Sequence, residues 1–196
     1  TSAGLDRFKK AHPDKYYDIG IAEQNLIGIA AGFASENHNV LTTTFAPFQA
    51  IRCCEQIKVN LGYMKHKICM VGIASGLVLG NLGFTHCCIE DIGILRSIPN
   101  LTIVSPADSL EVVKVLQSVL KEKKTSVYIR LTGGANNPIV YNSDYKFVLG
   151  KAIELTEGDD VTIFSSGSMV YQSLQASKLL KEKKINAKVV NMHTIK

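Results

Sequence analysis

The 196-residue sequence is 46% hydrophobic and 20% charged, which suits a globular chain that can form one full domain and part of a second. Its longest apolar stretches, such as residues 26–33, are broken by glycine, so we expect no membrane span. Residues 1–17 lack the apolar core of a signal peptide. The abrupt beginning suggests that residues preceding Thr1 are missing from the sequence.

The formal net charge of +5 is concentrated in two nearly identical lysine clusters, at residues 121–124 and 181–184. Each cluster ends an amphipathic segment, and lysines in the last turn of a helix complement its dipole. Basic stretches interleaved with aromatic residues are absent. We therefore expect no nucleic-acid partner.

The five cysteines, at positions 53, 54, 69, 87 and 88, show no Cys-x-x-Cys spacing. An odd number of cysteines without a signal peptide indicates reduced thiols and a cytoplasmic protein. His86, Cys87 and Cys88 are adjacent in the chain, and three consecutive side chains do not converge on one zinc ion. We predict no metal site within this chain.

The elements predicted from hydrophobic periodicity alternate between strand and helix. Tyr16 to Gly20 predicts a short strand, which leads into a helix over residues 22–36. A β-branched strand at 40–45 is followed by a helix from Pro47 to about Gly62. An apolar strand at 67–74 precedes a glycine-rich loop over 76–86.

A short helix at 89–97 and a strand at 101–105 come next in the chain. Asp108 and Glu111 then have capping-box spacing at the start of a helix that reaches Lys121, and a strand follows at 127–131. Such alternation predicts an α/β fold with a doubly wound, mostly parallel sheet.

Residues 132–145 resemble a linker, and a second strand–helix–strand unit follows at 160–166, 168–183 and 185–192. We therefore predict a first domain over residues 1–145 and the start of a second α/β domain over 146–196. One such unit cannot cover both faces of its sheet. The second domain is accordingly predicted to be truncated at Lys196.

Two features place chemistry at the ends of the first strands. Glu23 lies where a strand meets a helix, and Phe45 and Phe48 follow the next strand. Because ligands of open parallel sheets bind beyond the carboxyl ends of the strands, Glu23 and Phe48 could converge on one flat heterocycle. The alternative is that Glu23 only complements the dipole of its helix and that the phenylalanines only fill the core.

Four segments resemble the pyrimidine-binding domain of the transketolase family: DIGIAEQNLIGIAAGFA, TTFAPFQAIRCCEQIKVN, GFTHCCIEDIGILRSIPNLTIVSPAD and YIRL. The resemblance continues into FSSGSMV and KVVNMHTIK, which are similar to the start of the family's C-terminal domain. The separately encoded C-terminal subunits of split transketolases resemble this chain most.

This resemblance implies a thiamine-diphosphate-dependent enzyme that transfers a two-carbon ketol unit between sugar or sugar-phosphate substrates. Glu23 matches the glutamate that activates the cofactor through its aminopyrimidine ring. Phe48 matches the aromatic ring that stacks on the pyrimidine, and Phe45 matches a neighbouring wall of the pocket. The cofactor supplies the electron sink that protein side chains lack.

Further residues match the family's substrate contacts. His86 matches a histidine near the reacting carbonyl, and Arg130 matches an arginine that binds the sugar phosphate. Leu82 stands where ordinary transketolases have an acidic residue, and Ala74 stands where the family has a second histidine. These two departures put ordinary ketose-phosphate specificity in question.

The sequence has no Gly-Asp-Gly motif of the kind that holds the cofactor's diphosphate through Mg²⁺. The resemblance therefore implies a diphosphate-binding N-terminal partner subunit or preceding segment, in a dimer or heterotetramer. Two alternatives stay open. One is a related enzyme, either the β-subunit of a 2-oxo acid dehydrogenase or a deoxyxylulose-phosphate synthase. The other is a degenerate paralogue without catalytic activity.

Overall fold

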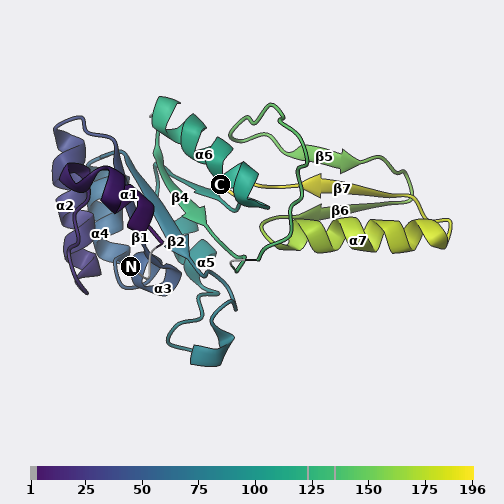
Figure 1. Cartoon of the computed structure of the whole chain (residues 1–196), viewed down its shortest axis with the longest axis horizontal. Helices are drawn as coiled ribbons and strands as arrows, with labels where there is room; N and C mark the ends of the chain where they lie inside the picture. The colour runs from purple at the N-terminus through teal and green to yellow at the C-terminus, as the bar shows by residue number, and fades with distance from the viewer. Residues whose placement is uncertain (1–3, 123, 135) are drawn as a thin grey trace.

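The computed structural model describes residues 4–122, 124–134 and 136–196, so Lys123 of the first lysine cluster and Ala135 of the expected linker lie outside it. Within these ranges, the chain forms two units side by side, each built on its own sheet (Figure 1). The sheet of the first unit is parallel, in the order β1-β2-β4-β3. Its strands are β1 (Val40–Phe45), β2 (Ile68–Ile73), β3 (Leu101–Val104) and β4 (Ser126–Arg130).

Helices cover both faces of this sheet, which confirms the predicted doubly wound α/β architecture. Successive side chains of β2 alternate between the faces, so Met70 packs with α2, α4 and α5 while Val71 packs with α6. None of the helices in the described ranges is long and apolar enough to cross a membrane. The helical elements are α1 (Asp6–Ala11), η1 (Pro13–Lys15), α2 (Glu23–Ser35), α3 (Ala46–Ala50), α4 (Cys54–Ile57), η2 (Lys58–Tyr63), η3 (Gly80–Leu82), α5 (Asp91–Arg96) and α6 (Ser109–Glu122).

The second unit contains the predicted strand–helix–strand sequence and one strand that was not predicted. β6 (Val161–Ser165) and β7 (Ala187–Asn191) pair in parallel, with α7 (Met169–Glu182) between them in the chain. β5 (Ile153–Thr156) adds an antiparallel edge to β7. The sheet therefore has three strands in the order β5-β7-β6 within the described residues.

The strand predicted at residues 16–20 is wrong, because this segment forms neither a helix nor a paired strand. The backbone N–H of Gly20 donates to the Asp18 carboxylate at 3.0 Å, and Gly20 has a φ of +73°. A side chain that binds the backbone two residues on favours a turn over an extended ladder. After this turn the chain enters α2, which begins at Glu23.

The single helix predicted from Pro47 to about Gly62 is also wrong, because a turn over residues 51–53 separates α3 from α4. At this turn the backbone N–H groups of Ile51 and Arg52 both donate to the carbonyl of Pro47. The Cys53 thiol lies 3.1 Å from the carbonyl of Phe48. The helix then continues through α4 into a π-helical segment, η2, before β2 begins.

The predicted capping box at α6 forms in a modified way. The Asp108 carboxylate accepts from the backbone N–H of Glu111 at 2.9 Å, as expected of an N-terminal cap. The Glu111 carboxylate accepts from the backbone N–H of Ala107 at 2.7 Å. In the usual capping box it would accept from the N–H of the capping residue itself, which here is Asp108. Asp108 also accepts from Val140 and Tyr141, so the expected linker is attached to α6. The domain boundary proposed between residues 145 and 146 stays a prediction.

Candidate functional site

Three of the six predicted site residues gather at the carboxyl end of β1. Phe45 ends β1 and Phe48 follows in α3, with their ring centroids 6.1 Å apart. His86 enters from the loop after β2, and its ring centroid lies 6.3 Å from that of Phe45 and 5.4 Å from that of Phe48. Three side chains predicted separately from the sequence therefore form one aromatic cluster.

Glu23 is the first residue of α2 and only 8% exposed. A carboxylate there is favoured by the positive end of the helix dipole, but a buried charge also needs a direct partner. That partner is Arg52, whose Nη1 lies 2.6 Å from Oε2 of Glu23. Burial raises the pKa of the nearby Cys53 thiol to about 12, and the charge of Glu23 acts in the same direction.

Arg52 joins Glu23 to the aromatic cluster and was not predicted as a site residue. Its guanidinium carbon lies 4.2 Å from the centroid of the Phe48 ring, which is cation–π contact distance. The side-chain amide of Gln24 donates to the backbone carbonyl of Arg52 at 3.1 Å. The sequence held one signal, since positions 48 and 52 have the i, i+4 spacing of neighbours on a helix.

The loop that carries His86 is closed at its base. Gly76 and Cys88 form an antiparallel bridge, with N–H···O distances of 2.7 and 2.8 Å. Beyond this base the loop extends away from the first sheet, at the bottom of Figure 1. The hydroxyl of Thr85 lies 3.0 Å from Nδ1 of His86 and orients its ring.

Arg130 ends β4 and pairs with Asp91, the first residue of α5. Nε of Arg130 lies 2.8 Å from Oδ2 of Asp91, which also accepts from the Tyr128 hydroxyl at 3.0 Å. Asp91 is fully buried. The burial of Tyr128 raises the pKa of its hydroxyl, and the negative charge of Asp91 acts in the same direction. Sequence reasoning missed this anchoring role of Asp91. The proposed contact of Arg130 with a sugar phosphate stays a prediction.

Leu82 and Ala74 mark the two departures from the family pattern. Leu82 ends the short helix η3 on the same loop as His86 and is 50% exposed. Ala74 follows β2 directly and has a φ of +54°, a left-handed conformation that costs a non-glycine residue about 1–2 kcal/mol. The effect of either residue on a substrate stays a prediction.

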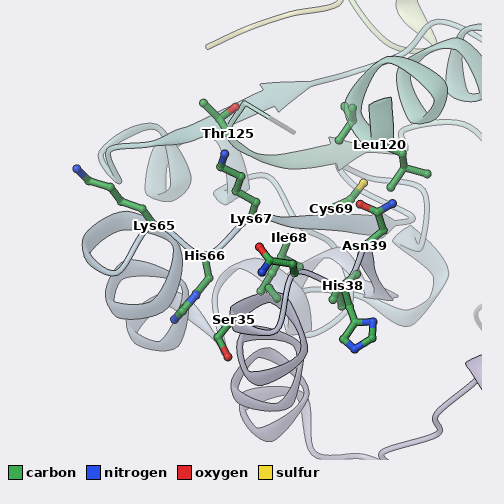
Figure 2. A pocket seen from close by; sticks show the side chains of 14 residues that line it. Ser35, His38, Asn39, Lys65, His66, Lys67, Ile68, Cys69, Leu120 and Thr125 are labelled. Carbon is green, nitrogen blue, oxygen red and sulfur yellow. The ribbon is translucent and has the colours of Figure 1, made fainter. Parts of the chain in front are cut away.

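A separate cavity of about 320 Å³ lies at the other end of the strands, beside the amino ends of β1, β2 and β4. Lys65, Lys67, His38 and His66 contribute to its lining, and none of the six predicted site residues does. Figure 2 shows that Lys65 and Lys67 point in different directions and that His38 lies apart from both. Because these side chains do not converge, the cavity offers no defined anion site.

Comparison with known proteins adds independent information. The family model described as the transketolase pyrimidine-binding domain matches residues 1–137, and that of the transketolase C-terminal domain matches residues 150–196. An apulose-4-phosphate transketolase subunit from Phocaeicola vulgatus is 40% identical over the whole chain, which covers 62% of that protein. A 6-deoxy-6-sulfo-D-fructose transketolase subunit from a Clostridium species is 36% identical over the whole chain, which covers 60% of it.

A solved structure described as a split-gene transketolase, in an inactive β4 tetramer, superimposes with a TM-score of 0.88 at 35% identity. The match covers 98% of this chain and 62% of that one. The chain spans about 60% of the length of the first curated relatives that it matches, and about 30% of the length of a human transketolase. Its fold, its ordered motifs and a family model that matches more than half of its residues agree: the chain belongs to the transketolase family.

Proposed function

We propose that this chain is the pyrimidine-binding part of a thiamine-diphosphate-dependent transketolase. It would transfer a two-carbon ketol unit between sugar or sugar-phosphate substrates. The observation that carries the proposal is the buried carboxylate of Glu23 beside the half-buried Phe45–Phe48–His86 cluster. A dipole-stabilising glutamate alone would not need an aromatic cluster next to it.

The residues fit the aminopyrimidine ring of the cofactor. A flat, nitrogen-rich group, the Arg52 guanidinium, already binds Glu23 and lies on Phe48, so a flat nitrogen heterocycle can use the same two contacts. Thiamine diphosphate supplies a nucleophilic carbon and an electron sink, which side chains lack. Glu23 would hold a proton at N1′ of the ring, and Phe48 would orient it. His86, fixed by Thr85, would donate to an oxygen of the substrate near the reacting carbonyl.

The diphosphate and Mg²⁺ would be held by another chain or segment, since this sequence has no Gly-Asp-Gly motif. The loop beyond the Gly76–Cys88 bridge supports an interface there, because Leu77 and Phe84 are 72% and 85% exposed. Apolar side chains gathered on one projecting loop indicate a docking surface. We propose a dimer or heterotetramer with the diphosphate-binding subunit. The five free cysteines support a cytoplasmic location.

The proposal predicts that Glu23→Gln abolishes turnover while the subunit stays folded. An amide cannot hold a proton at N1′ as a carboxyl group does, and loss of such proton transfer lowers rates by about 10²–10⁴-fold. Turnover is measured with the diphosphate-binding half present, and folding is followed by circular dichroism. Glu36→Gln, at the exposed far end of the same helix, is the matched control. Near-normal turnover of the Glu23 variant contradicts the proposal.

A further inference from the structure

Arg52 makes both contacts that the proposed function assigns to the cofactor's aminopyrimidine ring. Its Nη1 donates to the Glu23 carboxylate at 2.6 Å, where N1′ of the ring would bind. Its guanidinium carbon lies over Phe48 at 4.2 Å, where the ring would stack. A guanidinium is flat and donates N–H groups, so it resembles the N1′-protonated form of the aminopyrimidine, which is also flat and donates an N–H to a carboxylate.

The backbone of Arg52 is held in place, and its side chain, which contacts Glu23 and Phe48, borders solvent. The turn over residues 51–53 sets the residue between α3 and α4, and Gln24 binds its carbonyl at 3.1 Å. The side chain is nevertheless 43% exposed. It can therefore turn into solvent when another group takes over its contacts with Glu23 and Phe48.

We propose that Arg52 is a placeholder for the aminopyrimidine ring. It binds Glu23 and Phe48 in the cofactor-free subunit and leaves them when thiamine diphosphate binds. This inference rests on the proposed function and adds that Arg52 competes with the cofactor for Glu23 and Phe48. The placeholder gives the buried Glu23 carboxylate a partner when no cofactor is bound, since an unpaired buried charge is strongly unfavourable. It also weakens cofactor binding, because the ion pair and the stacking contact must break first.

The test measures binding of thiamine diphosphate with Mg²⁺ by titration calorimetry, on the subunit together with its diphosphate-binding half. Arg52→Gln should lower the dissociation constant by about 5- to 30-fold, because one partly exposed ion pair and one cation–π contact no longer compete. Lys58→Gln removes the same charge from an exposed position further along the same helical segment. It should change the constant by less than about twofold.

A double-mutant cycle separates the two contacts. In a Glu23→Gln background, Arg52→Gln should tighten binding by only about two- to fivefold, the share of the stacking contact. Arg52→Lys keeps the charge without the planar group, so its affinity should lie between those of wild type and Arg52→Gln. This variant decides the question if Arg52→Gln does not fold.

Unchanged or weaker binding by the Arg52 variants overturns the placeholder, because Arg52 would then be neutral toward the cofactor or would help to hold it. The proposed function survives that result if Glu23→Gln still abolishes turnover. Full turnover by Glu23→Gln removes both the function and the placeholder. The two failures are therefore distinguishable.

Discussion

Leu82 bears on which substrate the proposed enzyme accepts. It lies four residues before His86 on the same loop and is half exposed, so a substrate near His86 could reach it. A leucine offers no acceptor to a substrate hydroxyl, and an unpaired buried hydroxyl costs about 1–3 kcal/mol. We therefore expect poor turnover of common ketose phosphates and a preference for a substrate with an apolar group, such as a deoxy carbon, at that position.

Leu82→Asp should raise kcat/KM for xylulose 5-phosphate by about 5- to 150-fold, which corresponds to the same 1–3 kcal/mol. The measurement compares wild type and variant in the enzyme completed by its diphosphate-binding half. Leu179→Asp makes the same substitution at an exposed position of α7, away from the His86 loop, so it controls for the added charge and should have no effect. An efficient wild type that the aspartate does not improve would show that Leu82 is not a specificity determinant.

For single residues, the sequence located the candidate site but not its internal contacts. Phe45, Phe48 and His86 follow successive strands of one parallel sheet, so topology alone brings them to the same edge. The pairing of Glu23 with Arg52 depends on the turn between α3 and α4, which the helical pattern of the segment concealed. A contact that depends on where a helix breaks is not encoded in the spacing of its apolar residues.

Among the elements, the Tyr128 side chain of β4 lies directly against Gly72 of β2. A Cβ atom at Gly72 would lie 2.3 Å from the hydroxyl of Tyr128, so only glycine leaves room for that ring. The same hydroxyl donates to the Asp91 carboxylate, which also holds Arg130. The glycine in β2 thus supports the ion pair beneath the His86 loop.

Gly72→Ala should destabilise the protein by about 1–3 kcal/mol, because the added methyl group forces Tyr128 away from Asp91. The free energy of unfolding in urea measures the loss. Gly32→Ala is the control, since a Cβ atom there meets nothing within 4 Å on the exposed side of α2. That change should stabilise the helix by about 0.5–1 kcal/mol. Equal stability of wild type and Gly72→Ala would contradict the close approach.

Segments that bury a continuous face were predicted well, and segments set by local or edge contacts were predicted poorly. The strands of the first sheet and the helices α2, α6 and α7 were located from periodicity, because each buries a continuous face. The strand predicted at 16–20 does not form because the Asp18 carboxylate accepts a hydrogen bond from the backbone N–H of Gly20, which favours a turn. β5 was missed because it is a short edge strand whose partner, β7, lies more than thirty residues further along the chain.

Across the whole molecule, the two units are joined by backbone and side-chain contacts. The residues after β7 run antiparallel beside β3: Ser105 N–H donates to the His193 carbonyl at 2.7 Å, and Ile195 N–H donates to that of Ile103 at 2.9 Å. This segment covers the edge of the first sheet, where unpaired backbone groups would otherwise be exposed. No sequence period could predict it, because the pairing joins residues about ninety positions apart.

Glu111 is the buried centre of this junction. Its carboxylate lies on α6 with no exposure and accepts from the side-chain amide of Asn191 in β7 at 3.0 Å. It also accepts from the Tyr145 hydroxyl at 2.9 Å and from the N–H of Ala107 at 2.7 Å. One side chain therefore ties α6, the connecting segment and the second sheet together. Without it, the Ala107 N–H, the Tyr145 hydroxyl and the Asn191 amide would each lose an acceptor.

Glu111→Ala should lower the free energy of unfolding by at least about 3 kcal/mol, since each buried donor left without an acceptor costs about 1–3 kcal/mol. Urea denaturation measures the loss, and Glu122→Ala, exposed in the last turn of the same helix, should be close to wild type. Hydrogen exchange distinguishes a junction from a local defect. Loss of the junction should speed exchange in β7 as well as in α6, because Asn191 loses its anchor. Faster exchange confined to α6 would mean that Glu111 only caps its own helix.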